Sequence, residues 1–317
     1  DLGLPLLMNS WWDGGNQAGI YEQNVARHSF VAEDGSYIYW QRPNGEGPYL
    51  VMVPEAGTSL EFKDKARAGE GPFGESDPSW EGLVQYYIHS ASIAPIRTAA
   101  NKAGQYLPAT ATTLPAGQGK EYGFTFRWAD DDKQLRDVLY DAGVVDAVSL
   151  PGMTIPDDTT ATLAVRAKDG IQDVEGGGGL GSAGQDATIT PAGSANGYQL
   201  YSVKFHTRGV NYVTVRYGNG RRSVMQYASI APIGDLIDAN AAFLVSEQQS
   251  TDGSRGYDGA YLQWDMKTKQ QVTRQNVDSV ALAALGEANK RWMTGGADDA
   301  GLSPAAFPAT KNTVSPD

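Results

Sequence analysis

The chain has 317 residues, which is enough for about two domains at ~150 residues each. Its 37 acidic and 25 basic residues give a formal net charge of −12, so its field repels polyanions and we expect no nucleic-acid partner. No apolar stretch approaches the ~20 residues of a membrane-spanning helix, so we expect no membrane partner either.

Metal and thiol chemistry have little support in the sequence. Cysteine is absent, which removes disulfides, thiol nucleophiles and thiolate metal sites. His28, His89 and His206 are far apart in the sequence, and there is no His-x-x-x-His or Gly-x-Ser-x-Gly element. His89 and His206 fall in strand patterns, where hydrogen-bonded sheet histidines are the simpler interpretation. We therefore expect no metal and no cofactor.

Strand patterns dominate the chain up to about residue 230. Short alternating or β-branched runs are separated by glycine and proline, which favours an antiparallel β-sandwich over residues 1–230. A helix is predicted at 130–140, where three aspartates precede Leu135, Val138 and Leu139 on one face. A tight turn is predicted at 217–220. The clearest predicted strands are 36–41, 49–53, 83–90, 122–128, 160–166, 198–206, 211–217 and 223–228.

The hydrophobic period changes after Pro232. Residues 233–249 carry apolar side chains at spacings of three and four, and 278–293 repeat the pattern, so both segments are predicted helices. Two helices cannot bury both of their apolar faces against each other alone. We therefore expect a linker or first helix at 231–249 and the incomplete start of a helical domain at 250–317.

Aromatic residues and carboxylates are the groups that remain for chemistry, and glycoside chemistry uses both. Trp11 and Trp12 lie in an irregular glycine-rich stretch, where they either contact a sugar or plug one end of the sandwich core. The segment 252–265 connects the two predicted helices, so its side chains could line the entrance of a substrate site. The alternative is a solvated loop with its tryptophan packed inward. The candidates in this segment are Asp258, Tyr261, Trp264 and Asp265.

Three segments resemble a known architecture. They are 236–249 (LIDANAAFLVSEQQ), 256–265 (GYDGAYLQWD) and 298–316 (DDAGLSPAAFPATKNTVSP). They look like parts of the six-hairpin glycosidase-like proteins, specifically a mostly bacterial, secreted branch. The resemblance implies a β-sandwich, a linker helix and then an (α/α)6 toroid, of which this chain holds only the first helices. The exported-type composition, acidic and poor in lysine, agrees with a secreted protein.

The resemblance also implies a function. We expect the N-terminal part of a carbohydrate-active enzyme, an inverting glycoside hydrolase acting on a bacterial or plant polysaccharide or oligosaccharide, whose catalytic acid and base lie outside this chain. Its partners would be the carbohydrate and the C-terminal remainder of the same polypeptide. In glucoamylase-like toroids a Trp and an Asp of early loops bind the terminal sugar, and Trp264 and Asp265 occupy a comparable place. The alternatives are a polysaccharide lyase, a glycoside phosphorylase, or a non-catalytic carbohydrate-binding or adhesion module.

Overall fold

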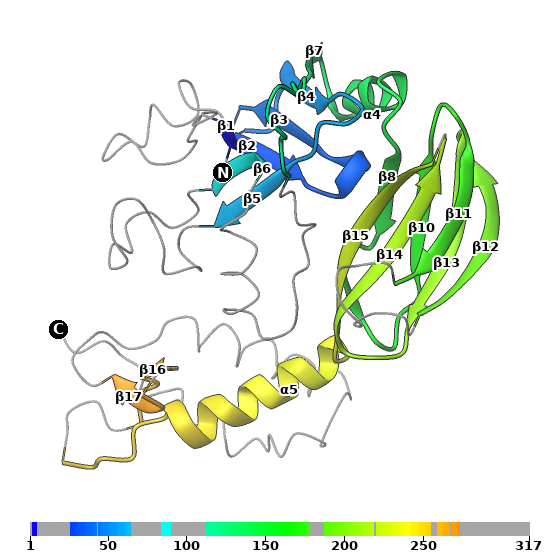
Figure 1. Cartoon of the computed structure of the whole chain (residues 1–317). Coiled ribbons are helices and arrows are strands. Elements are labelled where there is room, and N and C mark those ends of the chain that lie inside the picture. The colour runs from blue at the N-terminus through cyan, green and yellow to red at the C-terminus, as the bar shows by residue number, and fades with distance from the viewer. Residues whose placement is uncertain are drawn as a thin grey trace. The chain divides into compact units, whose positions relative to one another are not determined.

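The computed structural model describes residues 2–4, 26–42, 44–64, 84–89, 112–177, 187–218, 220–254, 259–266 and 268–272. The chain divides into two compact units, Asp1–Ile230 and Ala231–Asp317. The described residues are mainly β, with antiparallel sheets apart from one short parallel pair, and their only α-helices are α4 and α5 (Figure 1). The prediction of a mainly β, antiparallel chain is confirmed. An (α/α)6 toroid is not seen in the described residues and stays a prediction.

Two antiparallel sheets form the first part of the first unit. The N-terminal sheet has the order β2-β3-β4-β7, with strands β2 (Ala26–Phe30), β3 (Tyr37–Gln41), β4 (Tyr49–Pro54) and β7 (Phe124–Ala129). The small sheet has the order β1-β6-β5, with strands β1 (Leu2–Leu4), β6 (Val84–His89) and β5 (Glu61–Asp64).

The N-terminal sheet is covered on both faces. On one face, Val51 shares a core with Leu135 and Leu139 of helix α4 (Asp132–Asp141). On the other face, Met52 shares a core with Tyr86 of the small sheet. Successive side chains of a strand point to opposite faces, so β4 is buried along nearly its whole length.

Helix α4 begins as its sequence predicts. The Oδ1 atom of Asp131 accepts a hydrogen bond from the backbone N–H of Gln134 at 2.7 Å, which satisfies one of the free donors of the first turn. Leu135, Val138 and Leu139 are buried together on one side. The helix predicted at 130–140 is therefore confirmed.

A β-sandwich forms the second part of the first unit. One of its sheets has the order β12-β13-β10-β8, with strands β12 (Ala187–Ala195), β13 (Tyr198–Phe205), β10 (Ala161–Arg166) and β8 (Asp146–Leu150). The other has the order β11-β14-β15-β9, with strands β11 (Ile171–Gly176), β14 (Gly209–Tyr217), β15 (Arg221–Ile230) and the parallel β9 (Thr154–Pro156).

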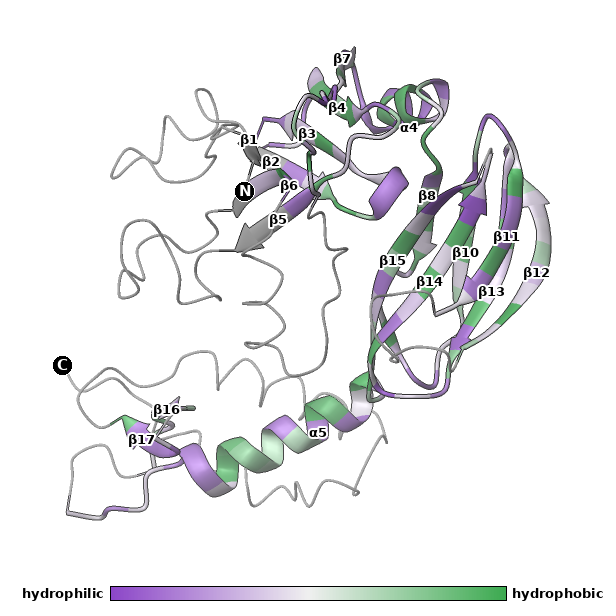
Figure 2. Ribbon diagram, in the orientation of Figure 1, coloured by the Kyte–Doolittle hydropathy of each residue, from purple (hydrophilic) through white to green (hydrophobic). Residues whose placement is uncertain are grey.

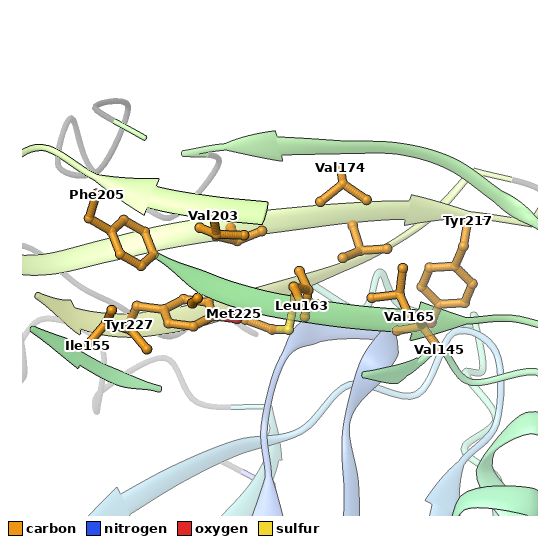
Figure 3. Close-up of a cluster of buried hydrophobic side chains, with 13 residues drawn as sticks. Val145, Ile155, Leu163, Val165, Val174, Val203, Phe205, Tyr217, Met225 and Tyr227 are labelled. Carbon is orange, nitrogen blue, oxygen red and sulfur yellow. The ribbon is translucent and has the colours of Figure 1, made fainter. Parts of the chain in front are cut away.

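The sandwich buries its core between these two sheets. Hydrophobic and hydrophilic residues alternate along its strands (Figure 2), as expected when each strand presents one face to the core. Figure 3 shows the buried side chains lying between the strands, including Leu163 and Val203 from one sheet and Met225 from the other. The predicted turn between β14 and β15 is present, with Gly218 and Gly220 at positive φ.

The sandwich is shorter than the one predicted over residues 1–230. It comprises β8 to β15, while the strands before α4 build a separate layered structure in the same unit. The reason is that most of the N-terminal sheet is already covered, on one face by α4 and on the other by the small sheet, which leaves only its β7 edge open.

The α4 layer and the sandwich meet at Asp146, whose side chain has no exposed surface. Its Oδ2 atom accepts a bond from Nε of Arg166 at 2.9 Å, and its Oδ1 atom one from Nη1 of Arg136 in α4 at 3.3 Å. The hydroxyl of Tyr198 also donates to Oδ2. A buried carboxylate is tolerated only with such partners, so this network holds α4 and three sandwich strands in one arrangement.

The same network shifts the ionisation of its members. Burial, and then the bond to Asp146, raises the pKa of Tyr198 to about 12. Burial alone would lower the pKa of Arg166, but its bonds to Asp146 and Asp137 raise that pKa above its ordinary value. These shifts favour a protonated Tyr198, which donates to Asp146, and a charged Arg166 at neutral pH.

A second connection joins the N-terminal sheet to the sandwich. The short 3-10 helix η1 (Glu33–Gly35) precedes β3, and Nη2 of Arg222 in β15 donates to Oε1 of Glu33 at 2.6 Å. The hydroxyl of Tyr217 donates to the backbone oxygen of Asp34 at 2.8 Å. Gly35 packs so closely on Ser223 that a Cβ there would lie 2.2 Å from its Oγ atom.

The second unit begins with helix α5 (Ile233–Phe243), which continues into a π-helical turn, η3 (Leu244–Gln248). The helix predicted at 233–249 is confirmed to within a residue. A hairpin of β16 (Gln263–Asp265) and β17 (Gln270–Val272) follows. The segment 252–265 therefore ends in a strand and not in a solvated loop, and this strand has too few residues to show an alternating pattern in the sequence. The helix predicted at 278–293 lies outside the described residues.

Neither α4 nor α5 is long and apolar enough to cross a membrane, and no other helix among the described residues is.

Replacing Asp146 should destabilise the first unit strongly. Asp146→Asn leaves two guanidinium groups without their buried counter-charge, and we expect a loss of about 3 kcal/mol in the free energy of unfolding, measured with urea. The control is Asp137→Asn, because Asp137 bonds to the same Arg166 at 2.9 Å but its side chain is 52% exposed. That variant should lose less than about 1 kcal/mol. Equal losses for the two variants would contradict this account.

Adding a methyl group at Gly35 should separate η1 from β15. Gly35→Ala places a Cβ against the buried Ser223, and we expect a loss of about 1–3 kcal/mol, visible as a lower thermal unfolding midpoint. Gly119→Ala is the matched control, since nothing lies within 4 Å of its added Cβ. A midpoint for Gly35→Ala as high as that of the control would show that the contact is not tight.

Candidate functional site

Trp264 lies in β16 and is half-buried. Its ring meets the ring of Phe243, at the end of α5, edge to face, with the centroids 5.3 Å apart and the planes at 85°. The hairpin partner of Trp264 is Gln271, whose Nε2 atom donates to the backbone oxygens of Glu247 at 2.8 Å and of Gln249 at 3.1 Å. The indole is therefore held against the end of the helical segment while part of its surface stays accessible.

Asp265 follows Trp264 directly and belongs to the turn of the hairpin. Its Oδ1 atom accepts a bond from the backbone N–H of Thr268 at 3.2 Å, and its backbone oxygen accepts one from Lys269 at 2.8 Å. Lys269 has a positive φ, so this turn needs the stabilisation that Asp265 provides. Because successive strand residues point to opposite faces, Trp264 and Asp265 lie on opposite faces of the hairpin.

Tyr261 is in the interior of the second unit. Its side chain has no exposed surface, burial raises the pKa of its hydroxyl, and that hydroxyl has no hydrogen-bond partner within the described part of the chain. The surrounding backbone is well ordered by the bond from Leu262 N–H to Gln248 at 2.9 Å and by a bridge between Tyr261 and Gln249. The ring packs as a core residue, and only its hydroxyl is available for a polar group.

The remaining candidates, Trp11, Trp12 and Asp258, lie outside the described residues. Phe243 and Gln271, which position Trp264, were missed by sequence reasoning. In the sequence, Phe243 is one apolar residue among several in a predicted helix. A strand pair of three residues has no recognisable sequence pattern, so the pairing of Gln271 with Trp264 could not be predicted. The described ranges contain no group of three or more His, Asp or Glu residues that could hold a metal ion.

A second set of polar groups lies on the small sheet. Glu61 pairs with Tyr87 across the two strands, and His89 follows two residues later on the same face. Glu61 has no exposed surface and His89 is 9% exposed. A ring nitrogen of His89 is 2.7 Å from the hydroxyl of Tyr122. The interpretation of His89 as a hydrogen-bonded sheet histidine is confirmed, whereas no sequence pattern indicated that Glu61 is buried.

Comparison with known proteins gives a fold relative and a family. The fold is similar to that of a solved protein described as a polysaccharide lyase, with a TM-score of 0.61 and 12% sequence identity. The match covers 96% of this chain and 41% of the lyase, so the chain spans about two fifths of that protein. No curated protein matches the chain.

The family match covers nearly the whole chain. Residues 1–316 match the model of a family described as "Family of unknown function (DUF5695)". Neither match is to the six-hairpin glycosidase-like proteins, so that resemblance stays an expectation. The chain belongs to DUF5695, a family of unknown function.

Proposed function

We propose that this chain is part of a carbohydrate-active enzyme that acts on a polysaccharide. The observation that carries the proposal is the fold likeness to a protein described as a polysaccharide lyase, which extends over 96% of this chain. The half-buried indole of Trp264 gives independent support, because an aromatic ring held by its neighbours can stack on the apolar face of a sugar.

In this proposal Trp264 and Asp265 have different roles. Their places on opposite faces of the hairpin prevent them from holding the same side of one sugar ring. Trp264 makes the sugar contact, positioned by Phe243 and by the Gln271 side chain. Asp265 closes the turn through Thr268 and keeps the hairpin in shape. This replaces the joint sugar-binding role expected for the pair from sequence.

The first candidate reaction is inverting glycoside hydrolysis. It needs two carboxylates far enough apart to admit a water molecule between sugar and base. In the first unit, Asp146 is saturated by Arg136, Arg166 and Tyr198, so it is not such a group. We propose, as the family resemblance implies, that the catalytic acid and base lie outside this chain, in the remainder of a secreted polypeptide whose toroid begins after residue 250.

The second candidate reaction is lyase chemistry, the activity named in the description of the fold relative. A lyase abstracts the proton at C5, beside the carboxylate group of the sugar, and the C4–O glycosidic bond breaks, so that a C4=C5 double bond forms and the departing oxygen takes up a proton. Hydrolysis leaves no such double bond, so the products separate the two reactions.

The expected result for the full-length protein that contains this chain is the shortening of at least one polysaccharide in a panel of plant and bacterial glycans. New reducing ends without ultraviolet absorbance indicate a hydrolase, and reducing ends with the absorbance of a conjugated uronate indicate a lyase. A sugar phosphate that appears only with added phosphate indicates a phosphorylase. Binding without any product would contradict an enzyme and leave a carbohydrate-binding module.

Replacing Trp264 should weaken catalysis without unfolding the protein. Trp264→Ala removes a stacking contact, and we expect kcat/KM on the glycan to fall about ten- to a hundredfold, or about 1–3 kcal/mol. Asp265→Asn keeps an oxygen that can accept the Thr268 bond, so its kcat/KM should stay within about threefold of wild type. If Trp264→Ala keeps both the wild-type kcat/KM and the wild-type unfolding midpoint, Trp264 does not contact the substrate.

A further inference from the structure

Two large aromatic side chains of the first unit are exposed on one strand. Trp128 is 65% exposed and Phe126 is 51% exposed, both in β7. Residues two apart in a strand lie on the same face, about 7 Å apart along the strand. We call Phe126 and Trp128 the aromatic platform. Strand β7 is the last in the order β2-β3-β4-β7, so the platform lies at an edge of the N-terminal sheet.

The register of the sheet shows which face carries the platform. Phe126 pairs with Met52, and Trp128 pairs with Leu50, across the neighbouring strand β4. Met52 packs toward the small sheet, whereas α4 covers the opposite face. Phe124, two residues before Phe126, is already packed against the core around Met52. Phe124 is therefore covered by the core that β4 shares with the small sheet, whereas Phe126 and Trp128, further along the same face of β7, are exposed to solvent.

The platform is held rigidly. Strand β7 pairs with β4 from Phe124 to Ala129, and Ala129 is fully buried. Beyond the strand, Gly47 packs on the carbonyl of Asp130 so closely that a Cβ at Gly47 would lie 1.8 Å from that oxygen. A contiguous apolar surface on such a fixed strand costs free energy in water at roughly 25 cal/mol per Å², so an uncovered aromatic pair indicates a binding surface.

We infer that the aromatic platform binds a neutral glycan, a role that rests on the proposed function and adds a second sugar contact to Trp264. Asn44 and Glu46 have exposed side chains that can bond to sugar hydroxyls, and they lie in the turn before Gly47, which packs on the backbone oxygen of Asp130, two residues after Trp128. Arg127, between the two aromatics, points to the opposite face. With that cation turned away and a chain charge of −12, the occupant is an uncharged glycan and not a polyanionic one, which fits the hydrolase candidate and not the lyase candidate.

The test is native affinity electrophoresis of the full chain. The gels contain soluble hydroxyethyl cellulose, xyloglucan, galactomannan, starch or laminarin, with polygalacturonate as the anionic comparison. At least one neutral polysaccharide should retard the chain, and polygalacturonate should not. Trp128→Ala should raise the dissociation constant at least about tenfold, and the Phe126→Ala/Trp128→Ala double variant should reduce retardation further, to the level that Trp264 alone supports. Trp128→Tyr, which keeps an aromatic ring, should retain most of it.

The matched control is Arg127→Ala, because Arg127 is exposed on the same strand but on the other face. It should bind like wild type. If alanine at Trp128 lowers stability, Trp128→Thr, which keeps a β-branched side chain in the strand, takes its place. The proposal is overturned if no neutral polysaccharide retards the chain, or if the double variant is retarded as strongly as wild type. A double variant that only converts a dimer to a monomer in sedimentation would make the platform a contact between two copies.

The result of this binding test can be distinguished from the result of the test of the proposed function. If platform variants lose retardation but no glycan is ever cleaved, the platform stands and the enzyme proposal fails. If a glycan is cleaved but platform variants bind it normally, the enzyme proposal stands and the platform fails.

Discussion

The first unit depends on one buried carboxylate. Asp146 opens β8, and its partners come from three other elements: Arg136 from α4, Arg166 from β10 and Tyr198 from β13. A carboxylate removed from water costs several kcal/mol unless charged donors replace the lost hydration. The arrangement of α4 over the sandwich is therefore tied to one geometry, in which both guanidinium groups reach the same carboxylate.

The position of α4 determines what the N-terminal sheet can offer to a ligand. The helix covers the face of β4 that carries Val51, and the small sheet covers part of the other face around Met52. What remains open is the edge of that second face, where Phe126 and Trp128 lie. The hydrogen bond from Arg222 of β15 to Glu33 of η1 also holds the N-terminal sheet to the sandwich.

Sequence patterns predicted the elements with strong local signals. The aspartates before Leu135 marked α4, and alternation marked β10, β13, β14 and β15. They missed β12, which is largely exposed and contains a proline and a glycine, and they missed the division of the first unit, because alternation does not reveal which sheet a strand joins. For the candidate site, they proposed Trp264 and Asp265 together and could not show that Asp265 points away from Trp264. That geometry depends on a three-residue strand pair.

We propose that accessible indoles of this chain contact a neutral glycan. The most direct measurement is the NMR spectrum of the indole N–H groups of the seven tryptophans, assigned with single Trp→Phe variants and titrated with a neutral oligosaccharide. We expect the indole signals of Trp128 and Trp264 to shift during the titration, each along a binding curve with a single dissociation constant. The signal of Trp40, which is 3% exposed, should not shift. Unchanged Trp128 and Trp264 signals at millimolar sugar would contradict it.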